Sequence, residues 1–269
     1  MKKGCSLASA TLFLFLLALL LPAAVLAVWS FTLRWPWPGL LPRAFSTDQW
    51  SAFFSLSGGA FEIVGRSALL AGGVTVLSLL ISLPAAKALA LLSFPGKRIV
   101  EMLVLAPVLV PPISYAPGMH ALFLRIGIAD SFTGVLLSHL VPCLPYGIRI
   151  LTNVFRALGE TLEIQARVLE ASPFRAFFHI TLPLIAPGIA SAGGLLFIVS
   201  LSQYLLTFFL GGGKIVTLSL ALFPLVKSGE RPAAAVWSIV FILVSLSFCL
   251  VLEKGVKRYS SSKETFFLS

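Results

Sequence analysis

The side chains that could carry catalytic or metal chemistry are few and scattered along this 269-residue chain. The three cysteines have neither metal-ligand spacing nor the even number of a disulfide framework, and we expect none of the three histidines to bind a metal. No HExxH or GxSxG motif occurs, and no pair of carboxylates is suited to catalysis within a membrane. The sequence therefore predicts neither an active site nor a cofactor bound by this chain.

One polar segment, residues 156–183, has a spacing suited to a different task, the docking of one protein on another. Glu163 and Arg167 are four residues apart, in the order that favours an ion pair on a helix. An amphipathic helix can dock in the groove of a partner, or it can pack on its own membrane domain, and the pattern leaves both open. The apolar residues recur at helical spacing and form one face: Leu158, Leu162, Ala166 and Leu169.

A corner is predicted inside this polar segment. The first helix is expected to stop near Glu170. Ser172 is a suitable N-cap for a second helix, and Pro173 is a suitable first residue because its missing N–H costs nothing there. The sequence therefore predicts two short amphipathic helices joined by a tight turn.

The composition indicates that this segment belongs to a membrane protein. Hydrophobic residues make up 58% of the chain and charged residues 11%, with a mean hydropathy of +1.00. A soluble domain carries about 25% charged residues, so this chain has too few to cover a water-facing surface. An ordinary soluble enzyme and a disordered protein are both excluded. We expect the net charge of +10 to reflect the positive-inside rule rather than binding to nucleic acid.

Six apolar runs are long enough to cross a bilayer, which takes about 20 residues. They predict an all-α membrane protein with six transmembrane helices and both termini in the cytoplasm, because more Lys and Arg fall on that side. A cleaved signal peptide is the alternative for the first run, since Lys2 and Lys3 precede it. The runs cover residues 7–28, 67–92, 99–124, 132–151, 184–210 and 233–252.

Prolines and polar residues interrupt two of these runs. Pro111 and Pro112 remove backbone donors from the third run. Ser202, Gln203 and Tyr204 are polar residues within the fifth. Irregular backbone at membrane depth survives only inside protein or against a watery cavity. We interpret these five residues as candidate pathway or hinge positions, with ordinary tolerance of prolines and polar side chains in a helix bundle as the alternative.

Acidic residues are almost absent from the centres of the runs. A carrier driven by protons or ions needs buried ionisable groups that bind its coupling ion. Their scarcity indicates that the energy for any transport comes from outside this chain, and a secondary carrier is kept as the alternative.

The polar segment resembles the cytoplasmic "EAA" loop of bacterial binding-protein-dependent ABC transporter permeases. Residues 171–174, 180–183 and 187–188 carry the resemblance, and residues 73–86 are similar to the opening span of the same permease core. The family pattern runs Glu-Ala-Ala, three residues, Gly, nine residues and Ile-x-Leu-Pro. The similarity covers about residues 66–253.

Three positions depart from that pattern: Ile164 stands for Glu, Gln165 for the first Ala and Glu170 for Gly. The second Ala is kept as Ala166, and Glu163 is the nearest carboxylate to replace the lost one. Because a residue other than glycine is costly in a left-handed conformation, we expect the helix to continue through Glu170 and the turn to follow it.

The resemblance implies the transmembrane subunit of an importer with a type I ABC permease core in the bacterial inner membrane. Its loop would dock on a cytoplasmic ABC ATPase dimer that holds the ATP and Mg²⁺, and an extracytoplasmic binding protein would deliver a small solute. A second permease, identical or related, would complete the path through the lipid bilayer. The resemblance does not choose among polyamine, thiamine, ferric ion, sulfate and molybdate. The implied coupling residues are Glu163, Ile164, Gln165, Ala166, Arg167, Glu170, Ala171, Ser172, Pro173 and Phe174.

These inferences divide the chain into three parts. Residues 1–65 are expected to form the first transmembrane helix and an extracytoplasmic loop, residues 66–253 the permease core, and residues 254–269 a cytoplasmic basic tail. A bulky charge at Ala166 or Ala171 is expected to uncouple ATP hydrolysis from uptake.

Overall fold

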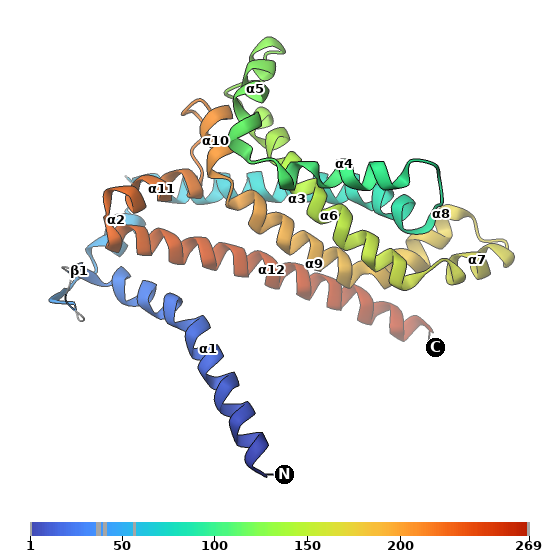
Figure 1. Cartoon of the computed structure of the whole chain (residues 1–269), viewed down its shortest axis with the longest axis horizontal. Helices are drawn as coiled ribbons and strands as arrows, with labels where there is room; N and C mark the ends of the chain where they lie inside the picture. Colours follow the sequence, from blue (N-terminus) through green and yellow to red (C-terminus); the bar gives the residue numbers. More distant parts are fainter. Residues whose placement is uncertain (1, 36–38, 40–41, 56–57, 268–269) are drawn as a thin grey trace. The chain divides into compact units, whose positions relative to one another are not determined.

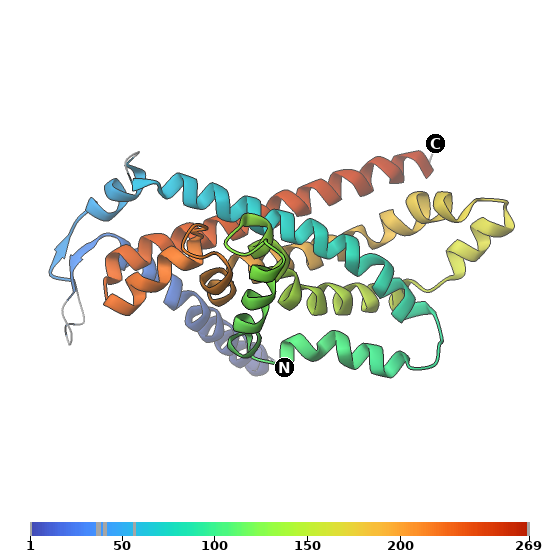
Figure 2. The same cartoon turned by 90° about the horizontal axis from the view of Figure 1, so that it is seen from above.

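A computed structural model describes the chain except residues 1, 36–38, 40–41, 56–57 and 268–269. The described part is mostly helical, with two short paired strands and one π-helix (Figure 1, Figure 2). The first half contains α1 (Lys2–Ser30), β1 (Thr32–Arg34), β2 (Ala44–Phe45), α2 (Asp48–Phe54), α3 (Ala60–Leu91), α4 (Lys97–Leu109) and α5 (Pro112–Arg125). The second half contains α6 (Phe132–Leu158), α7 (Thr161–Val168), α8 (Pro173–Ala176), the π-helix η2 (Phe177–Thr181), α9 (Leu182–Leu201), α10 (Tyr204–Leu210), α11 (Leu218–Ser228) and α12 (Arg231–Phe267).

Five helices of the described part are long and apolar enough to cross a bilayer. The prediction of an all-α membrane protein is therefore confirmed. The count of spans is five, or up to six if the bent pair α4 and α5 is taken as one span, and the N-in, C-in topology stays a prediction. The spanning stretches are Thr11–Ser30, Ala60–Leu91, Phe132–Leu158, Pro173–Leu201 and Arg231–Val256.

The third predicted run, residues 99–124, is not one continuous helix. It is divided between α4 and α5, which are bent by 98°. Val110 and Pro111 are extended, with ψ angles of 120° and 136°. A residue that precedes proline is driven into extended backbone, and Pro112 has no N–H to continue a helix, so α4 ends and α5 begins afresh.

The fifth predicted run, residues 184–210, also differs from the structure. The spanning stretch begins earlier, at Pro173, and α9 ends at Leu201. Ser202 and Gln203 separate α9 from α10, with Gln203 at a non-helical ψ of 86°. The polar residues noted in the sequence therefore coincide with a break in the helix.

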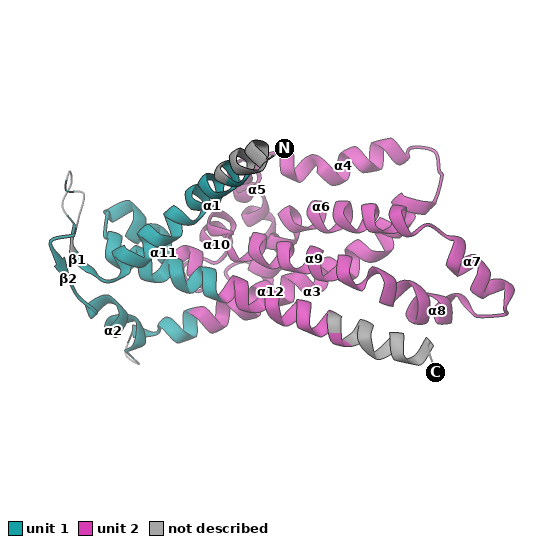
Figure 3. Ribbon diagram, turned by 90° about the horizontal axis from the view of Figure 1, so that it is seen from below, with its two compact units in different colours: residues 1–63, 221–243 teal, residues 64–220, 244–269 magenta. Residues whose placement is uncertain are grey.

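The chain divides into two compact units (Figure 3). Unit 1 consists of residues 1–63 and 221–243, and unit 2 of residues 64–220 and 244–269. In unit 1, β1 and β2 form an antiparallel pair, and aromatic side chains gather around the buried Phe53. Its ring lies edge-on to that of Trp237, with 5.2 Å between centroids. Unit 2 contains both helix breaks and the polar segment 156–183.

Unit 2 is organised around α6 and α9, which pack against each other. Leu151 and Phe155 of α6 and Ile185 of α9 are almost wholly buried in one cluster. Helix α3 approaches α6 very closely at Gly147, where a Cβ would lie 2.6 Å from Ser82 Oγ. Small residues at such crossings allow helices without a hydrophobic driving force in lipid to pack through van der Waals contact.

His139 joins three helices inside this unit. Its Nδ1 lies 3.0 Å from Ser200 Oγ on α9, and its Nε2 lies 3.0 Å from Thr207 Oγ1 on α10. The Thr207 hydroxyl donates its own proton to the Gln203 carbonyl. It must therefore accept from Nε2–H, which leaves Nδ1 to accept from Ser200. A neutral histidine satisfies every group of this buried set and holds α10 beside the break that precedes it.

Replacement of His139 by alanine is expected to lower the free energy of unfolding by about 1–3 kcal/mol, because it leaves buried hydroxyls without partners. Thermal unfolding in detergent measures the change. His179→Ala is the matched control, since that ring is exposed, and it should change stability by less than about 0.5 kcal/mol. Equal stability of the His139 variant and the unmodified chain would contradict the bridging role.

Candidate functional site

The polar segment 156–183 folds as two short helices at one end of unit 2 (Figure 1). Its first residues still belong to α6, which ends at Leu158. Gly159 has a φ of 69° and closes the helix as glycine commonly does. Leu158 is therefore part of a membrane-spanning helix, and the predicted apolar face of the loop helix begins only at Leu162 on α7.

The prediction that the first helix continues through Glu170 is wrong. The helix ends at Val168, and Glu170 has a φ of 62°, in the left-handed region. The N–H of Ala171 bonds to the Ala166 carbonyl, and the N–H of Glu170 bonds to the Arg167 carbonyl. These two bonds are those of a Schellman motif, in which the left-handed residue is usually glycine. Glutamate thus keeps the turn that the family pattern assigns to glycine, because the paired carbonyls offset its steric cost.

The second helix begins as predicted. The Ser172 side chain accepts a hydrogen bond from the N–H of Arg175, and Pro173 opens α8. The chain then continues through the π-helix η2 into α9 without a break. The turn between α7 and α8 is therefore held at both ends, by the Schellman motif and by the serine cap.

Four large apolar side chains of this corner are turned towards solvent, and we call them the exposed loop residues. Three of the predicted coupling residues do not share this exposure, since Ala166 is only 7% exposed and Glu163 and Ala171 are half-buried. Gln165 and Arg167 are exposed. A contiguous stretch of large apolar groups in water typically marks a site of interaction. The exposed loop residues are Ile164 at 52%, Val168 at 77%, Leu169 at 82% and Phe174 at 76%.

Glu163 fixes α7 to the membrane helices. Both of its carboxylate oxygens lie 2.7 Å from Lys87 Nζ near the end of α3. It also accepts a hydrogen bond from the Thr181 hydroxyl at the end of η2. The Lys87 ammonium in turn lies 5.4 Å from the centre of the Phe177 ring, at the start of η2. One carboxylate therefore joins α3, α7 and η2.

This arrangement differs from two expectations for Glu163. Its hydrogen-bonded partner is Lys87, while Arg167 acts on it only as a nearby charge. Its side chain is 21% exposed and engaged within the domain, so it does not replace the carboxylate that Ile164 removes from the outer surface. The i,i+4 spacing gave the wrong partner because Lys87 offers a bidentate contact in a less solvated place.

The ionisation of Glu163 is fixed by its partners. Partial burial by itself raises the pKa of Glu163, but hydrogen bonds from Lys87 and Thr181 and the charges of Lys87 and Arg167 outweigh it and hold the pKa below its ordinary value. A lowered carboxylate pKa stabilises the fold at pH values above the unfolded pKa, and this contribution is lost as the pH falls through the folded pKa. The contact therefore persists throughout the neutral range.

The candidate hinge positions lie at the two breaks of unit 2. Pro111 lies between α4 and α5, and Pro112 begins α5. Ser202 and Gln203 lie between α9 and α10, and Tyr204 begins α10. The two short helices that follow these breaks, α5 and α10, pack on each other. The apolar residues that join them include Ala116, Phe123, Leu206 and Leu210.

Sequence reasoning did not identify three polar residues that organise this unit. Lys87 lies near the end of the second apolar run, and its position in the sequence gives no sign of a partner. Thr181 is part of the Ile-Thr-Leu-Pro motif, whose hydroxyl gave no sign of a partner. His139 looked isolated. The one signal in the sequence that Lys87 and Glu163 pair is that both are expected on the same side of the membrane.

Three curated relatives are permease proteins of transport systems. The trehalose transport system permease SugB of Mycobacterium tuberculosis is 28% identical over 225 residues, 81% of each chain. The spermidine/putrescine permease PotC of Haemophilus influenzae is 30% identical over 165 residues, 61% of this chain and 64% of that protein. The molybdate/tungstate permease WtpB of Thermococcus kodakarensis is 36% identical over 130 residues, 48% of this chain and 52% of that protein. No family model matches the chain.

A solved structure has the same fold. A bacterial ABC transporter that imports the acidic polysaccharide alginate contains a chain that superposes with a TM-score of 0.67 at 17% identity, covering 96% of each chain. The fold is thus that of the membrane subunits of ABC importers. The chain is thus similar in sequence to permease proteins of several transport systems and similar in fold to a chain of an ABC importer, which supports the resemblance to permeases noted in its polar segment.

Replacement of Glu170 by glycine is expected to stabilise the corner by about 1 kcal/mol, because glycine adopts the left-handed conformation without a Cβ clash. Thermal unfolding and the rate of tryptic cleavage after Arg167 measure the effect. Glu170→Ala removes the same carboxylate but keeps a Cβ, so it should not stabilise. An equal increase in stability in both variants would show that removal of the carboxylate charge, and not the backbone conformation, causes the stabilisation.

Reversal of either charge in the Lys87–Glu163 pair is expected to loosen α7, whereas the double exchange Lys87→Glu with Glu163→Lys should restore much of the lost stability. A double-mutant cycle on unfolding or on proteolysis of the loop should give a coupling of about 1 kcal/mol, since both side chains are partly solvated. Arg167→Glu with Lys87→Glu is the matched control and should show no rescue. Additive effects of the two substitutions in the first cycle would contradict a direct contact between Lys87 and Glu163.

Proposed function

We propose that this chain is the transmembrane subunit of an ATP-driven importer and that the segment 156–183 couples it to a cytoplasmic ATPase dimer, in which ATP and Mg²⁺ are bound. The observation that carries this proposal is the pairing of an exposed apolar corner with a partly buried tether, the contact of Glu163 with Lys87 and Thr181. A corner that only packed on its own domain would not leave Leu169 and Phe174 more than three-quarters exposed. The similarity of the chain to permease proteins of transport systems supports the same role.

The tether gives the corner a route to the membrane helices. A displacement of α7 acts through Glu163 on Lys87 of α3 and on Thr181 at the end of η2, directly before α9. The π-helix between α8 and α9 is a form of helix often found at functional sites. The breaks at Pro111–Pro112 and Ser202–Gln203 are then the positions at which unit 2 changes between two arrangements. The chain itself carries out no hydrolysis in this scheme.

The remaining parts of the system follow from the proposed role. An extracytoplasmic binding protein delivers a small solute, and a second permease, identical or related, lines the path through the bacterial inner membrane. One of the similar structures is an alginate transporter in complex with a periplasmic protein that holds the sugar. The curated relatives carry the names of a disaccharide, polyamines and oxyanions, which have little chemistry in common, so we assign no solute.

The docking role is tested by placing a charge on the exposed corner. Leu169→Asp and Phe174→Asp are expected to reduce the ATPase recovered with the tagged full chain, and solute uptake, by at least about tenfold, as loss of a central apolar anchor does at interfaces. Pull-down from native membranes with identification of the partner by mass spectrometry measures the first quantity. Ala166→Arg is unsuitable for this test because Ala166 is buried and the change would disturb the loop itself.

Leu33→Asp is the matched control, since it makes the same change at an exposed apolar residue of β1, on the side predicted to face away from the cytoplasm. It should leave ATPase recovery unchanged. Uptake driven by an ion gradient with no ATPase bound to the chain would overturn the proposal in favour of a secondary carrier.

A further inference from the structure

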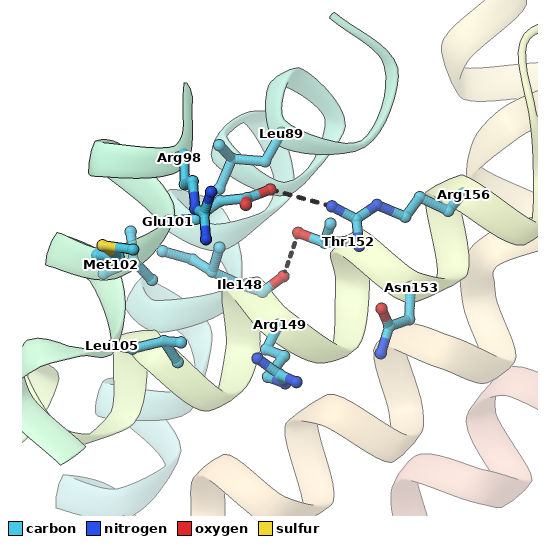
Figure 4. A pocket seen from close by; sticks show the side chains of 11 residues that line it. Leu89, Arg98, Glu101, Met102, Leu105, Ile148, Arg149, Thr152, Asn153 and Arg156 are labelled. Carbon is cyan, nitrogen blue, oxygen red and sulfur yellow. Dashed lines mark hydrogen bonds and ion pairs between the residues drawn. The ribbon is translucent and has the colours of Figure 1, made fainter. Parts of the chain in front are cut away.

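A basic pocket of about 280 Å³ lies between α3, α4 and α6, separate from the exposed corner (Figure 4). Figure 4 shows the lining side chains Arg98 and Glu101 on α4, and Arg149 and Arg156 on α6. The pocket also has an apolar part. This part is formed by Leu89, Met102, Val104, Leu105 and Ile148.

The charges of this pocket do not balance. Glu101 accepts a hydrogen bond from Arg156 at 3.0 Å, which neutralises one of three arginines. Arg98 and Arg149 have no carboxylate partner among the residues that the structure describes. Three arginines against one glutamate leave a net charge of +2. Thr152 does not compensate, because its hydroxyl donates to the Ile148 carbonyl. The pocket therefore presents two cations without a counter-ion.

The place of Arg149 along α6 sets the level of the pocket. Arg149 follows Phe132, the first residue of α6, by 17 residues, a rise of about 26 Å along the helix. The hydrocarbon core of a bilayer is about 30 Å thick, so Arg149 lies near one end of the span, where a cation reaches the level of the lipid headgroups. The unbalanced charges of the pocket therefore lie where anionic headgroups are present.

The surface beside the pocket indicates which anion this is. Helix α4 buries none of its residues, and Ile99, Met102 and Leu103 are all exposed. Met102 also lines the pocket, so the basic site opens onto an apolar helix surface. A free inorganic anion would gain nothing from apolar walls, whereas a phospholipid places a charged phosphate and acyl chains within one molecule.

We propose that this pocket binds the headgroup of an anionic phospholipid, with Arg98 and Arg149 on the phosphate and the acyl chains along α4. Basic pockets between membrane helices on the cytoplasmic side are suited to such headgroups. The assignment to the cytoplasmic leaflet rests on the proposed function, because the pocket and the coupling segment lie at the same ends of α3 and α6. The bound lipid would brace α4 against α6 next to the Glu101–Arg156 pair.

Lipid binding to the purified full chain in detergent tests this inference, with native mass spectrometry and added phosphatidylglycerol as the probe. Arg149→Gln and Arg98→Gln should each weaken phosphatidylglycerol binding about fivefold, the effect expected for one basic residue near a lipid surface. Arg149→Lys should retain most of the binding. Arg125→Gln removes one exposed arginine at the opposite end of α5 from the α4–α5 bend and should have no effect.

Two further arms distinguish the source of the anion. Phosphatidylcholine should bind weakly and with equal affinity to all variants. Inorganic phosphate should fail to displace phosphatidylglycerol, and its displacement of the lipid would overturn the lipid assignment in favour of a soluble anion. Equal losses in the Arg125 and Arg149 variants would also overturn it. ATPase recovery measured on the same preparations separates this inference from the proposed function. If the Arg98 and Arg149 variants bind phosphatidylglycerol as well as the unmodified chain and still recover the ATPase, the lipid site is refuted and the proposed function is not.

Discussion

The contact of Glu163 with Lys87 and Thr181 is the constraint on which the polar segment depends. Helix α7 has only eight residues, and an isolated helix of that length is not stable in water. It buries Ala166 and little else. The carboxylate supplies what packing does not, because it holds α7 to two elements that enter the membrane. The same contact leaves the apolar side chains of the corner free to face outwards, which is what a docking surface requires.

The membrane imposes the second constraint, since every backbone group inside it needs a partner within the protein. The break between α9 and α10 meets this condition through bonds from the N–H groups of Ser202, Gln203 and Tyr204 to carbonyls of the preceding turn. His139 then ties the two sides of the break together through Ser200 and Thr207. The three N–H groups at this change of direction therefore have partners within the chain.

The differences between sequence and structure have a common origin. The fold class, the similarity to permeases and the serine cap of α8 were predictable because each depends on stretches of residues read in order. Glu170 was predicted wrongly because the cost of its left-handed conformation is local, whereas the two hydrogen bonds of the Schellman motif that offset it form only when the chain turns. The prolines at 111 and 112 indicated an interruption within residues 99–124. The angle between α4 and α5 was not predictable, because it depends on what each helix packs against.

The sequence by itself determined that this protein is a helical membrane protein whose polar segment resembles that of permeases, because apolar length and motif spacing are properties of the linear chain. The tertiary structure decided which charges meet. Lys87 and Glu163 are 76 residues apart, and the three arginines of the α4–α6 pocket come from two helices. Electrostatic energy depends on distance in space and on solvent exposure, and neither is encoded in residue order alone.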